Sequence, residues 1–519
     1  MNKTENFVIE LPLATEKFQA EELNRRFELM RRIYNQAQNK LERQYLYFLS
    51  FRPFQDCKTN KEKREFLSTH SFSFKNFNDK AKEPLKITFT EFGIRSFLTK
   101  FAKEKVDSQY TYSDMGINTS MLSHMGNAIW SAWEKVIYKP DAKRIRYKRQ
   151  NDLNSIGVDW EPKHPMGFLL DLEKRQLKLN INNRQGQYAK HIIMSIEFGK
   201  KERQIEYETD ALKGSEENIK VLTIVRRKFK GKFRYFIQFT VRNNKPQKGR
   251  SLGKGKVAID LGVTKIAIVT DNTVRIIPLA PNVSSIESQM HILQRKMDRS
   301  RRAMNPNNFN EDGTVKRGVR LTWVKSERYK ALCQEKAELQ RKQAAIRKRD
   351  HILLANQLIE LGNEFIIEDN DVKEWAARRK EERRRKKDNK NLSKAGLGKF
   401  VNNHAPAMFV TILKNKVESL GGKFEKVPTE NGATEYDFTN DTYTKHKLTE
   451  KFITLSDGIR HQRDTLAAFN LFFLRIEEKG SKKVYQYDRS KMKEKYAWFN
   501  EQEKEFLQSI KKTRKKKAS

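Results

Sequence analysis

Three acidic residues stand out because each occupies a place where it could take part in metal-dependent chemistry. Asp260 ends the apolar stretch of KVAIDLGVTKIAIVTD, Glu368 ends that of FIIEDN, and Asp464 opens the apolar run of RDTLAAFN. Magnesium ions prefer oxygen ligands and keep some of their waters. A pair of such ions can activate water and stabilise the leaving oxygen of a phosphodiester. In a strongly basic chain, three acids of this kind indicate a nuclease.

The elements expected around these acids could bring them together. Asp260 and Glu368 each end a predicted strand, and Asp464 lies at the start of a helix predicted at 463–477. Strand ends meet at one edge of a sheet, and a helix N-terminus can point to the same edge. Three carboxylates there repel one another unless divalent cations bind between them. We expect two ions ~3.5–4 Å apart that clamp the scissile phosphate.

Each acid also has a simpler structural explanation. Asp before Leu-Gly at a strand end is often only a turn former. Glu368 has Asp369 and Asp371 as neighbours, which could take its place. Asp464 could be a helix-start acid that the helix dipole favours. The order, spacing and contexts of the three acids together favour the catalytic interpretation.

Charge and length limit the function classes. The 519 residues exceed one ordinary domain, and 106 Lys and Arg against 65 Asp and Glu give a formal net charge of +41. Nucleic acid phosphate is the expected partner of such a surface, with an anionic membrane as the rival. No apolar run of about 18 residues predicts a spanning helix, and residues 1–17 lack a signal-peptide core. We expect a cytoplasmic protein that acts on the nucleoid of a prokaryote and has no membrane partner.

Cysteine usage excludes a disulfide scaffold and paired-cysteine zinc sites. Cys57 and Cys333 are the two cysteines, and they lie far apart in sequence. A small packed residue is the expected role of Cys333. No structural zinc is expected.

Composition divides the chain into regions. A short strand at 6–13 precedes helices at 16–50 and 117–138, and residues 140–247 alternate in a mainly β pattern with a hairpin turn at Gly231. Polar, glycine-containing residues before 256 predict a linker. The expected domains are a β domain (1–15 and 139–248), a helical insertion (16–138), a nuclease domain (249–427 and 457–500), a small subdomain (428–456) and a basic, flexible tail (501–519).

The C-terminal half resembles the RuvC nuclease of transposon-encoded TnpB proteins and their descendants, the compact type V CRISPR effectors. The resemblance is carried by VAIDLGVTKIAIV, by FIIEDNDVKEW with its basic connector, and by RDTLAAFN, which is similar to the family's Arg-Asp-x-Asn-Ala-Ala-x-Asn. It covers residues 251–475. The N-terminal half agrees only in layout. The resemblance implies a multidomain α+β protein: an RNase H-like (RuvC) α/β nuclease domain plus an oligonucleotide-binding-type β-barrel domain with a helical insertion.

Two departures from the family pattern concern the third motif and the segment before it. Residues 431–461 contain no Cys where the family usually has two CxxC pairs, and His446 and His461 cannot supply a tetrahedral zinc site. Leu466 stands where the family often has Asn. The subdomain at 428–456 is therefore expected to be a Cys-less remnant of the zinc ribbon.

The resemblance implies an RNA-guided DNA endonuclease that cuts target DNA beside a short flanking motif. Asp260, Glu368 and Asp464 would be the catalytic metal ligands, with two Mg²⁺ as cofactor and Mn²⁺ as a possible substitute. Guide RNA and target double-stranded DNA would be the partners. The alternatives are a guide-free RuvC-type resolvase or transposase, and a catalytically silent RNA-guided DNA-binding repressor. The residues leave open whether the guide comes from a CRISPR array or a transposon end, and whether the protein is a monomer or a dimer.

Two basic segments are candidates for contact with nucleic acid. The hairpin at 221–241 interleaves cations with aromatic residues, which suits contact with unpaired bases but also fits a half-buried sheet. The connector at 376–390 has more cations than i,i+4 pairing uses. The candidate residues are Arg226, Arg227, Lys228, Lys230, Lys232, Arg378, Arg379, Arg383, Arg384 and Arg385.

Overall fold

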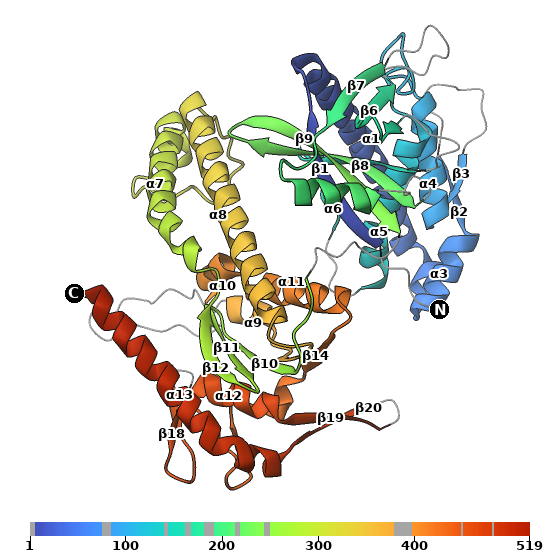
Figure 1. Cartoon of the computed structure of the whole chain (residues 1–519). Helices are drawn as coiled ribbons and strands as arrows, with labels where there is room; N and C mark the ends of the chain where they lie inside the picture. The colour runs from blue at the N-terminus through green and yellow to red at the C-terminus, as the bar shows by residue number, and fades with distance from the viewer. Residues whose placement is uncertain are drawn as a thin grey trace. The chain divides into compact units, whose positions relative to one another are not determined.

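The protein consists of two compact units, Met1–Lys248 and Gly249–Ser519. Figure 1 shows the elements of each unit. The structure is a computed structural model, and it describes residues 6–74, 85–139, 144–160, 168–180, 191–212, 218–242, 250–377, 397–447, 450–479 and 482–518. The described helices include none that is both long and apolar enough to span a bilayer. The boundary between the units falls in the linker predicted before residue 256.

Unit 1 contains a seven-stranded antiparallel sheet with strand order β4-β8-β9-β1-β7-β6-β5. The first strand, β1, lies between β9 and β7, so the predicted strand at 6–13 joins the sheet formed by the residues after 140. Its members are β1 (Asn6–Ala14), β4 (Ser155–Asp159), β5 (Phe168–Asp171), β6 (Gln176–Asn180), β7 (His191–Ile196), β8 (Ile219–Phe229) and β9 (Lys232–Arg242).

The helices of unit 1 pack on this sheet through one continuous core. In α1, Phe27 lies 6.5 Å from the ring of Tyr235 in β9, and Asn118 caps α5 by accepting from the backbone N–H of Met121. The predicted insertion at 16–138 therefore shares its core with the sheet. Its elements are α1 (Lys17–Ser50), α2 (Arg52–Gln55), α3 (Asn60–Thr69), β2 (Ser71–Phe74), β3 (Leu85–Thr88), α4 (Glu91–Lys100) and α5 (Thr119–Tyr138); α6 (Glu202–Leu212) lies between β7 and β8.

Unit 2 is built on a five-stranded mixed sheet with strand order β12-β11-β10-β13-β14. The first three strands are antiparallel, and β10, β13 and β14 are parallel. Parallel strands need crossover connections, and α8 and α11 supply them. The strands are β10 (Lys256–Leu261), β11 (Lys265–Thr270), β12 (Thr273–Pro278), β13 (Glu364–Glu368) and β14 (Lys423–Val427).

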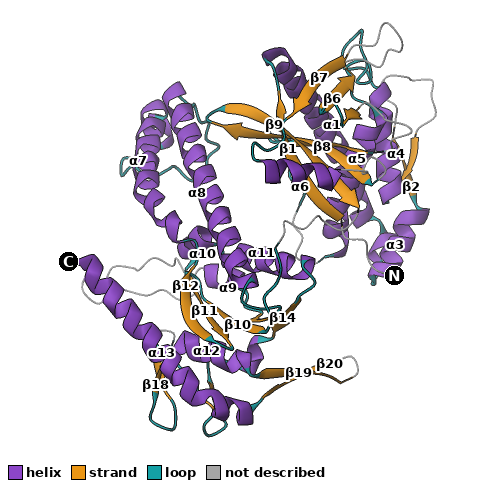
Figure 2. Cartoon of the chain, in the orientation of Figure 1, coloured by secondary structure: helices purple, strands orange, loops and turns teal. Residues whose placement is uncertain are grey.

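Helices cover both faces of this sheet. Alternate residues Val257, Ile259 and Leu261 pack with α8 and α11, whereas Ala258 packs with Leu471 of α12 on the other face. Figure 2 shows the sheet between these layers. The helices are α7 (Glu287–Met304), α8 (Glu327–Ile359), α9 (Val372–Ala376), α10 (Gly398–His404), α11 (Pro406–Ser419), α12 (Arg463–Phe472) and α13 (Arg489–Ala518).

Two predictions about the C-terminal part are wrong. The helix predicted at 463–477 ends at Phe472, because the side chains from Leu474 onward alternate between apolar and charged and form a hairpin of β19 (Leu474–Lys479) and β20 (Lys482–Tyr487). The tail predicted to be flexible is helical, because α13 runs through it to Ala518. Its residues are mostly strong helix formers, and buried Met492 and Phe499 anchor the helix.

Candidate active site and nucleic-acid interface

Asp260 and Glu368 lie side by side on neighbouring parallel strands. The register pairs Ile259 of β10 with Ile367 of β13, so the next residue of each strand is an acid. Both acids share the sheet face of Ala258 and Ile366, two residues earlier, because side chains alternate along a strand. This is the face that α12 covers. The structure therefore places two of the predicted acids at the carboxyl ends of adjacent strands.

The turn after Asp260 depends on glycine. The N–H of Gly262 donates to the carbonyl of Lys265 at 3.0 Å and closes the β10–β11 connection. A Cβ atom at position 262 would lie 2.8 Å from that same carbonyl oxygen, which real Cβ atoms do not tolerate. The Asp-Leu-Gly sequence thus forms a turn, as the simpler explanation requires. The turn also brings Lys265 to the site.

Asp464 lies in the first turn of α12 and is held by three neighbours. Lys265 Nζ lies 2.6 Å from its Oδ2, and the side-chain amide of Gln462 donates to Oδ2 at 3.1 Å. Arg463 NH2 lies 3.2 Å from Oδ1. Gln462 also caps the helix, since its Oε1 accepts from the N–H of Thr465 at 2.8 Å. Both carboxylate oxygens of Asp464 are therefore engaged by cationic or amide donors.

Burial and like charges set the electrostatics of the three acids. Burial raises the pKa of Asp260 well above its ordinary value, and the charges of Asp464 and Glu368 raise it further. Burial also raises the pKa of Glu368, although hydrogen bonds from Ala433 and Asn370 oppose the shift. Burial alone would raise the pKa of Asp464, but Lys265, Gln462 and Arg463 lower it below its ordinary value. Lys265, Gln462 and Arg463 thus outweigh burial at Asp464, whereas burial and the two like charges outweigh Arg463 and Lys265 at Asp260.

This donor set fits a hard divalent cation. The charges of Glu368 and Asp464 act directly on Asp260, and oxygen ligands of this kind suit Mg²⁺ or Mn²⁺. Within the described ranges, no three His, Cys, Asp or Glu side chains are already arranged to hold a metal, and Asp464 is instead paired with Lys265. Asp260, Glu368 and Asp464 are the residues that could hold the ions.

The acids beside Glu368 have other roles in the structure. Asp369 is exposed and pairs with Lys426 at 2.6 Å, and Asp371 caps α9 by accepting from the N–H of Lys373. Glu368 is the acid of this group that shares the α12 face with Asp260. The sequence did not indicate Glu435, whose charge contributes to the raised pKa of Glu368. No local pattern marks Glu435, because only the fold brings residues 433–435 to β13.

Removing the cation that pairs with Asp464 should strengthen metal binding. We expect Lys265→Met to lower by about threefold or more the Mg²⁺ concentration that half-maximally raises the melting temperature, since the ammonium competes for the carboxylate. Lys426→Met is the matched control, because Lys426 pairs with the exposed Asp369 near the same sheet edge. An unchanged Mg²⁺ midpoint in Lys265→Met, measured by thermal unfolding, would contradict this expectation.

Ordinary packing holds the Cys-less segment before α12. The side-chain amide of Asn470 in α12, itself buried, donates to the carbonyls of Ala433 and Tyr436 at 2.8 and 2.9 Å. The ring of Tyr436 stacks on Tyr487 of β20 at 4.2 Å. The segment forms two small hairpins, β15 (Tyr436–Asp437) with β16 (Thr442–Tyr443) and β17 (Phe452–Thr454) with β18 (Arg460–Gln462). These contacts connect the segment to α12 and to the C-terminal hairpin.

A buried acid of α13 supports the start of α12. Glu503 is 3% exposed and accepts from His461 Nδ1 at 2.8 Å, from the backbone N–H of Gln462 at 3.0 Å and from the hydroxyl of Thr465. His461 is thus a structural residue of this network. Glu503 fixes the residues on both sides of Asp464, and the sequence did not single it out.

The five predicted hairpin cations differ in their exposure and in their partners. Arg226 is 1% exposed, and its guanidinium donates to Asn24 and Leu153 and stacks on Phe27. The prediction that it faces RNA does not fit this position. Arg227 is exposed but pairs with Glu10. Lys228, Lys230 and Lys232 are exposed at the hairpin end, where Lys230 and Gly231 both have positive φ, as a two-residue type I′ turn requires. The remaining candidates, Arg378, Arg379, Arg383, Arg384 and Arg385, lie outside the described residues.

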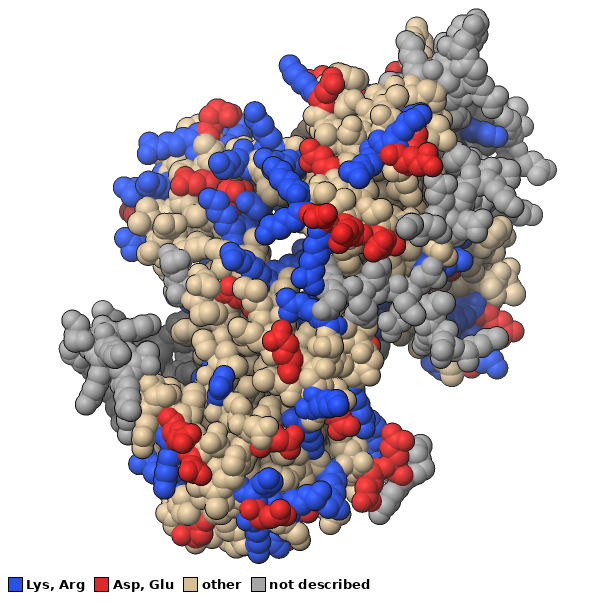
Figure 3. All heavy atoms as spheres, viewed as in Figure 1, with Lys and Arg blue, Asp and Glu red and all other residues tan. Residues whose placement is uncertain are grey.

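A second basic surface, on α7 and α8, was not indicated by the sequence. Figure 3 shows Lys and Arg gathered over these helices. At the tip between them, Arg301 lies over the rings of Phe309 and Trp323 at 5.9 and 4.8 Å. Buried Asn305 bonds to both backbone groups of Val324. The tip is thus held rigid. Its exposed cations include Arg302, Lys316, Arg317, Arg320, Lys325 and Arg328.

Comparisons with known proteins gave matches among solved structures only. No protein-family model matches the chain, and no curated protein is similar to it in sequence. A Cas12f1–sgRNA–target DNA complex aligns with TM-score 0.49 and 12% identity over 88% of this chain and 83% of that chain. A CRISPR-Cas12f ternary complex gives 0.29 and 12% over 91% and 84%, and a Cas12i–crRNA–double-stranded DNA complex gives 0.25 and 10% over 79% and 52%. None of these three TM-scores reaches one half.

Proposed function

We propose that this chain is an RNA-guided DNA endonuclease with a single Mg²⁺-dependent site of RuvC type. The observation that carries the nuclease assignment is the meeting of Asp260 and Glu368 on one face of adjacent strands, with Asp464 close enough for its charge to raise the pKa of Asp260. The strand order β12-β11-β10-β13-β14, with an antiparallel first half and a parallel second half, is the arrangement of an RNase H-like sheet. Two acids at strand ends and one at a helix start fit that fold.

The chemistry divides between the ions and the chain. When bound, Mg²⁺ would polarise the phosphodiester, activate the attacking water and stabilise the leaving oxygen. Asp260, Glu368 and Asp464 would be its ligands. Lys265 and Arg463 keep the pKa of Asp464 low, so that its carboxylate is charged and able to act as a ligand at neutral pH. Asp260 and Glu368 are half-buried, and charges act more strongly on one another where the surroundings are partly shielded from water.

Guidance by RNA is proposed from the sequence motifs and from charge. The three RuvC-like motifs resemble those of TnpB and compact type V effectors, and the net charge of +41 favours a large polyanionic partner. We assign the antiparallel sheet of unit 1 as an oligonucleotide-binding-type platform and the helices at 16–138 as its recognition insertion. Exposed Lys228, Lys230 and Lys232 at the end of the β8–β9 hairpin would contact phosphate. Target double-stranded DNA would be the second partner.

Sequencing of the RNA that co-purifies with the protein tests this proposal. The protein would be expressed with its native flanking DNA, and the expected result is one dominant RNA with a constant scaffold and a variable end. The reconstituted complex should then cut DNA that matches the variable end. Heterogeneous RNA together with cleavage of branched DNA by protein alone would replace the proposal with a guide-free resolvase or transposase. Guided binding without cleavage in Mg²⁺ or Mn²⁺ would identify a silent repressor.

Neutralising the hairpin should weaken RNA binding and its salt dependence together. For Lys228→Ala with Lys232→Ala, we expect the slope of log affinity against log salt to fall by about 0.7–0.9 for each phosphate that the protein no longer neutralises. The double variant Lys200→Ala with Lys201→Ala, at two exposed lysines before α6, changes the net charge equally. Filter binding across a salt series measures both slopes. Equal reductions in the two double variants would show that only net charge matters.

A further inference from the structure

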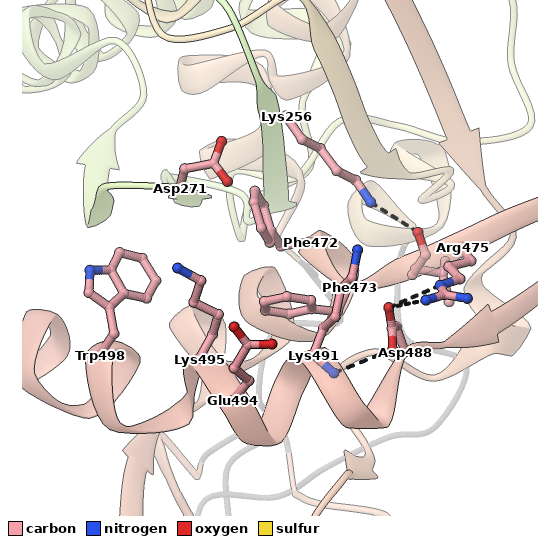
Figure 4. A pocket seen from close by; sticks show the side chains of 11 residues that line it. Lys256, Asp271, Phe472, Phe473, Arg475, Asp488, Lys491, Glu494, Lys495 and Trp498 are labelled. Carbon is pink, nitrogen blue, oxygen red and sulfur yellow. Dashed lines mark hydrogen bonds and ion pairs between the residues drawn. The ribbon is translucent and has the colours of Figure 1, made fainter.

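A cavity of about 390 Å³ lies in unit 2 at the sheet edge opposite the three acids. Lys256 begins β10, whereas Asp260 lies near the other end of that strand, and Asp271 follows the end of antiparallel β11. Phe472 and Phe473, where α12 ends, and residues of α13 complete the lining. Figure 4 shows these side chains around the cavity. Strand β10 thus begins, and antiparallel β11 ends, at a second concave site. The proposed function does not use this site.

Three lysines line this cavity, and acids act on two of them through charge alone, Glu364 on Lys256 and Asp488 on Lys491. Lys256 Nζ donates to the carbonyl of Leu474 at 2.9 Å, and in the described part of the chain no ion pair engages Lys256, Lys491 or Lys495. Lys491 and Lys495 lie one turn apart on α13 and are exposed. Figure 4 shows the amines of Lys256 and Lys491 converging.

The convergence of these amines has an electrostatic cost. Burial lowers the pKa of Lys256 to about 8; Glu364 opposes the shift, and the charges of Lys423 and Lys491 add to it. Like charges that face one space are stabilised when an anion binds between them. The acids of the cavity do not neutralise its lysines. Asp488 pairs with Arg475 at 3.0 Å, and the other two acids, Asp271 and Glu494, are outnumbered by the three lysines. An anionic group is the ligand that the cavity favours.

Aromatic rings line the same cavity. Phe472 and Phe473 pack edge to face at 5.0 Å, and half-buried Trp498 lies beside Lys495. Flat rings next to cations are the combination that binds a base and its phosphate together, because every base has a face that can stack. An acidic or phosphoserine peptide would use the lysines but would leave the indole without a stacking partner. The lining therefore favours a nucleotide.

We propose that this cavity binds one nucleotide of a single-stranded nucleic acid, with the phosphate between Lys256 and Lys491 and the base against Trp498. The cavity is separate from Asp260, Glu368 and Asp464, so binding there does not require the proposed nuclease function. A nucleic-acid strand bound at this site would lie at the edge of the sheet opposite the three acids. Its contacts would not depend on sequence, because neither lysines nor stacking read base edges.

Calorimetric titration of the RNA-free full chain with thymidine 5′-monophosphate, in low salt and EDTA, tests the proposal. We expect binding that is about tenfold weaker in Lys491→Ala with Lys495→Ala, since one charge-assisted hydrogen bond to phosphate and a second positive charge of the cavity are removed. The matched control is Lys493→Ala with Lys504→Ala, two exposed lysines of α13 outside the cavity. Asp260→Asn should bind the nucleotide as the natural sequence does, so nucleotide binding and cleavage fail independently.

Comparison of ligands separates the parts of the proposal. Thymidine and inorganic phosphate should each bind more weakly than the nucleotide, because each makes only one of the two interactions. Equal weakening in the two double-lysine variants would overturn the site. Phosphate binding as tightly as the nucleotide would overturn the role of Trp498, and tighter binding of a phosphotyrosine peptide would replace the nucleotide with a peptide ligand. Melting temperatures of all variants identify any that fail to fold.

Discussion

Replacing Asp260 by Asn is expected to abolish guided DNA cleavage, with a loss of about 10³-fold or more, because a ligand of the ions that stabilise the transition state is removed. Binding of RNA and DNA should persist, since the change removes a negative charge and leaves every lysine and arginine that could contact phosphate in place. Single-turnover cleavage and filter binding of the same complexes measure the two effects.

Asp369→Asn is the matched control for this variant. Asp369 follows Glu368 directly, but it is exposed and pairs with Lys426, so cleavage should stay near the natural level. Full activity in Asp260→Asn would refute the assigned site. A loss in Asp369→Asn as large as that in Asp260→Asn would place the second acid of the site one residue away from Glu368.

The same variant should have opposite effects on stability with and without metal. In EDTA, Asp260→Asn should melt higher than the natural sequence, because a buried charge that faces two other carboxylates has been removed. Mg²⁺ should raise the melting temperature of the natural sequence and leave that of the variant nearly unchanged, since only a protein that binds the ion gains stability from it. Loss of cleavage with an unchanged response to Mg²⁺ would show that Asp260 is not a metal ligand.

Glu503→Ala is expected to destabilise unit 2 by about 3 kcal/mol. The variant leaves two buried donors without their acceptor, His461 Nδ1 and the N–H of Gln462, and the hydroxyl of Thr465 loses one of its acceptors but keeps the carbonyl of Gln462. Because Gln462 and Thr465 flank Asp464, cleavage and the stabilisation by Mg²⁺ should fall as well. Scanning calorimetry of the full chain and its response to Mg²⁺ measure these effects.

Two further variants make the Glu503 prediction specific. Glu501→Ala lies two residues away on an exposed part of α13 and should change stability by less than about 0.5 kcal/mol. Glu503→Gln keeps one carbonyl acceptor and should fall between the two. If Glu503→Ala has the same melting temperature as Glu501→Ala, the buried network does not support α12. If it melts lower but responds normally to Mg²⁺, the network does not position Asp464.

Local patterns determined the elements that carry the acids. Short continuous apolar runs predicted the strands before Asp260 and Glu368, and the hairpin turn at Gly231 was readable because turns depend on single residue types. Where two patterns overlapped, the local interpretation failed. The apolar residues that continue from α12 past Phe472 predicted a longer helix, but pairing with β20 made them a strand.

The sequence by itself thus determined the three acids, the strands and helix that bear them, and a positive net charge that indicates a nucleic-acid partner. Only the tertiary structure decided which acid beside Glu368 faces Asp260, that Lys265 pairs with Asp464, that Arg226 is buried, and that Glu503 reaches back from α13 to the start of α12. The physical reason is the range of the interactions. Periodicity and capping act over a few residues of chain, whereas burial and charge pairing depend on residues that only folding brings together.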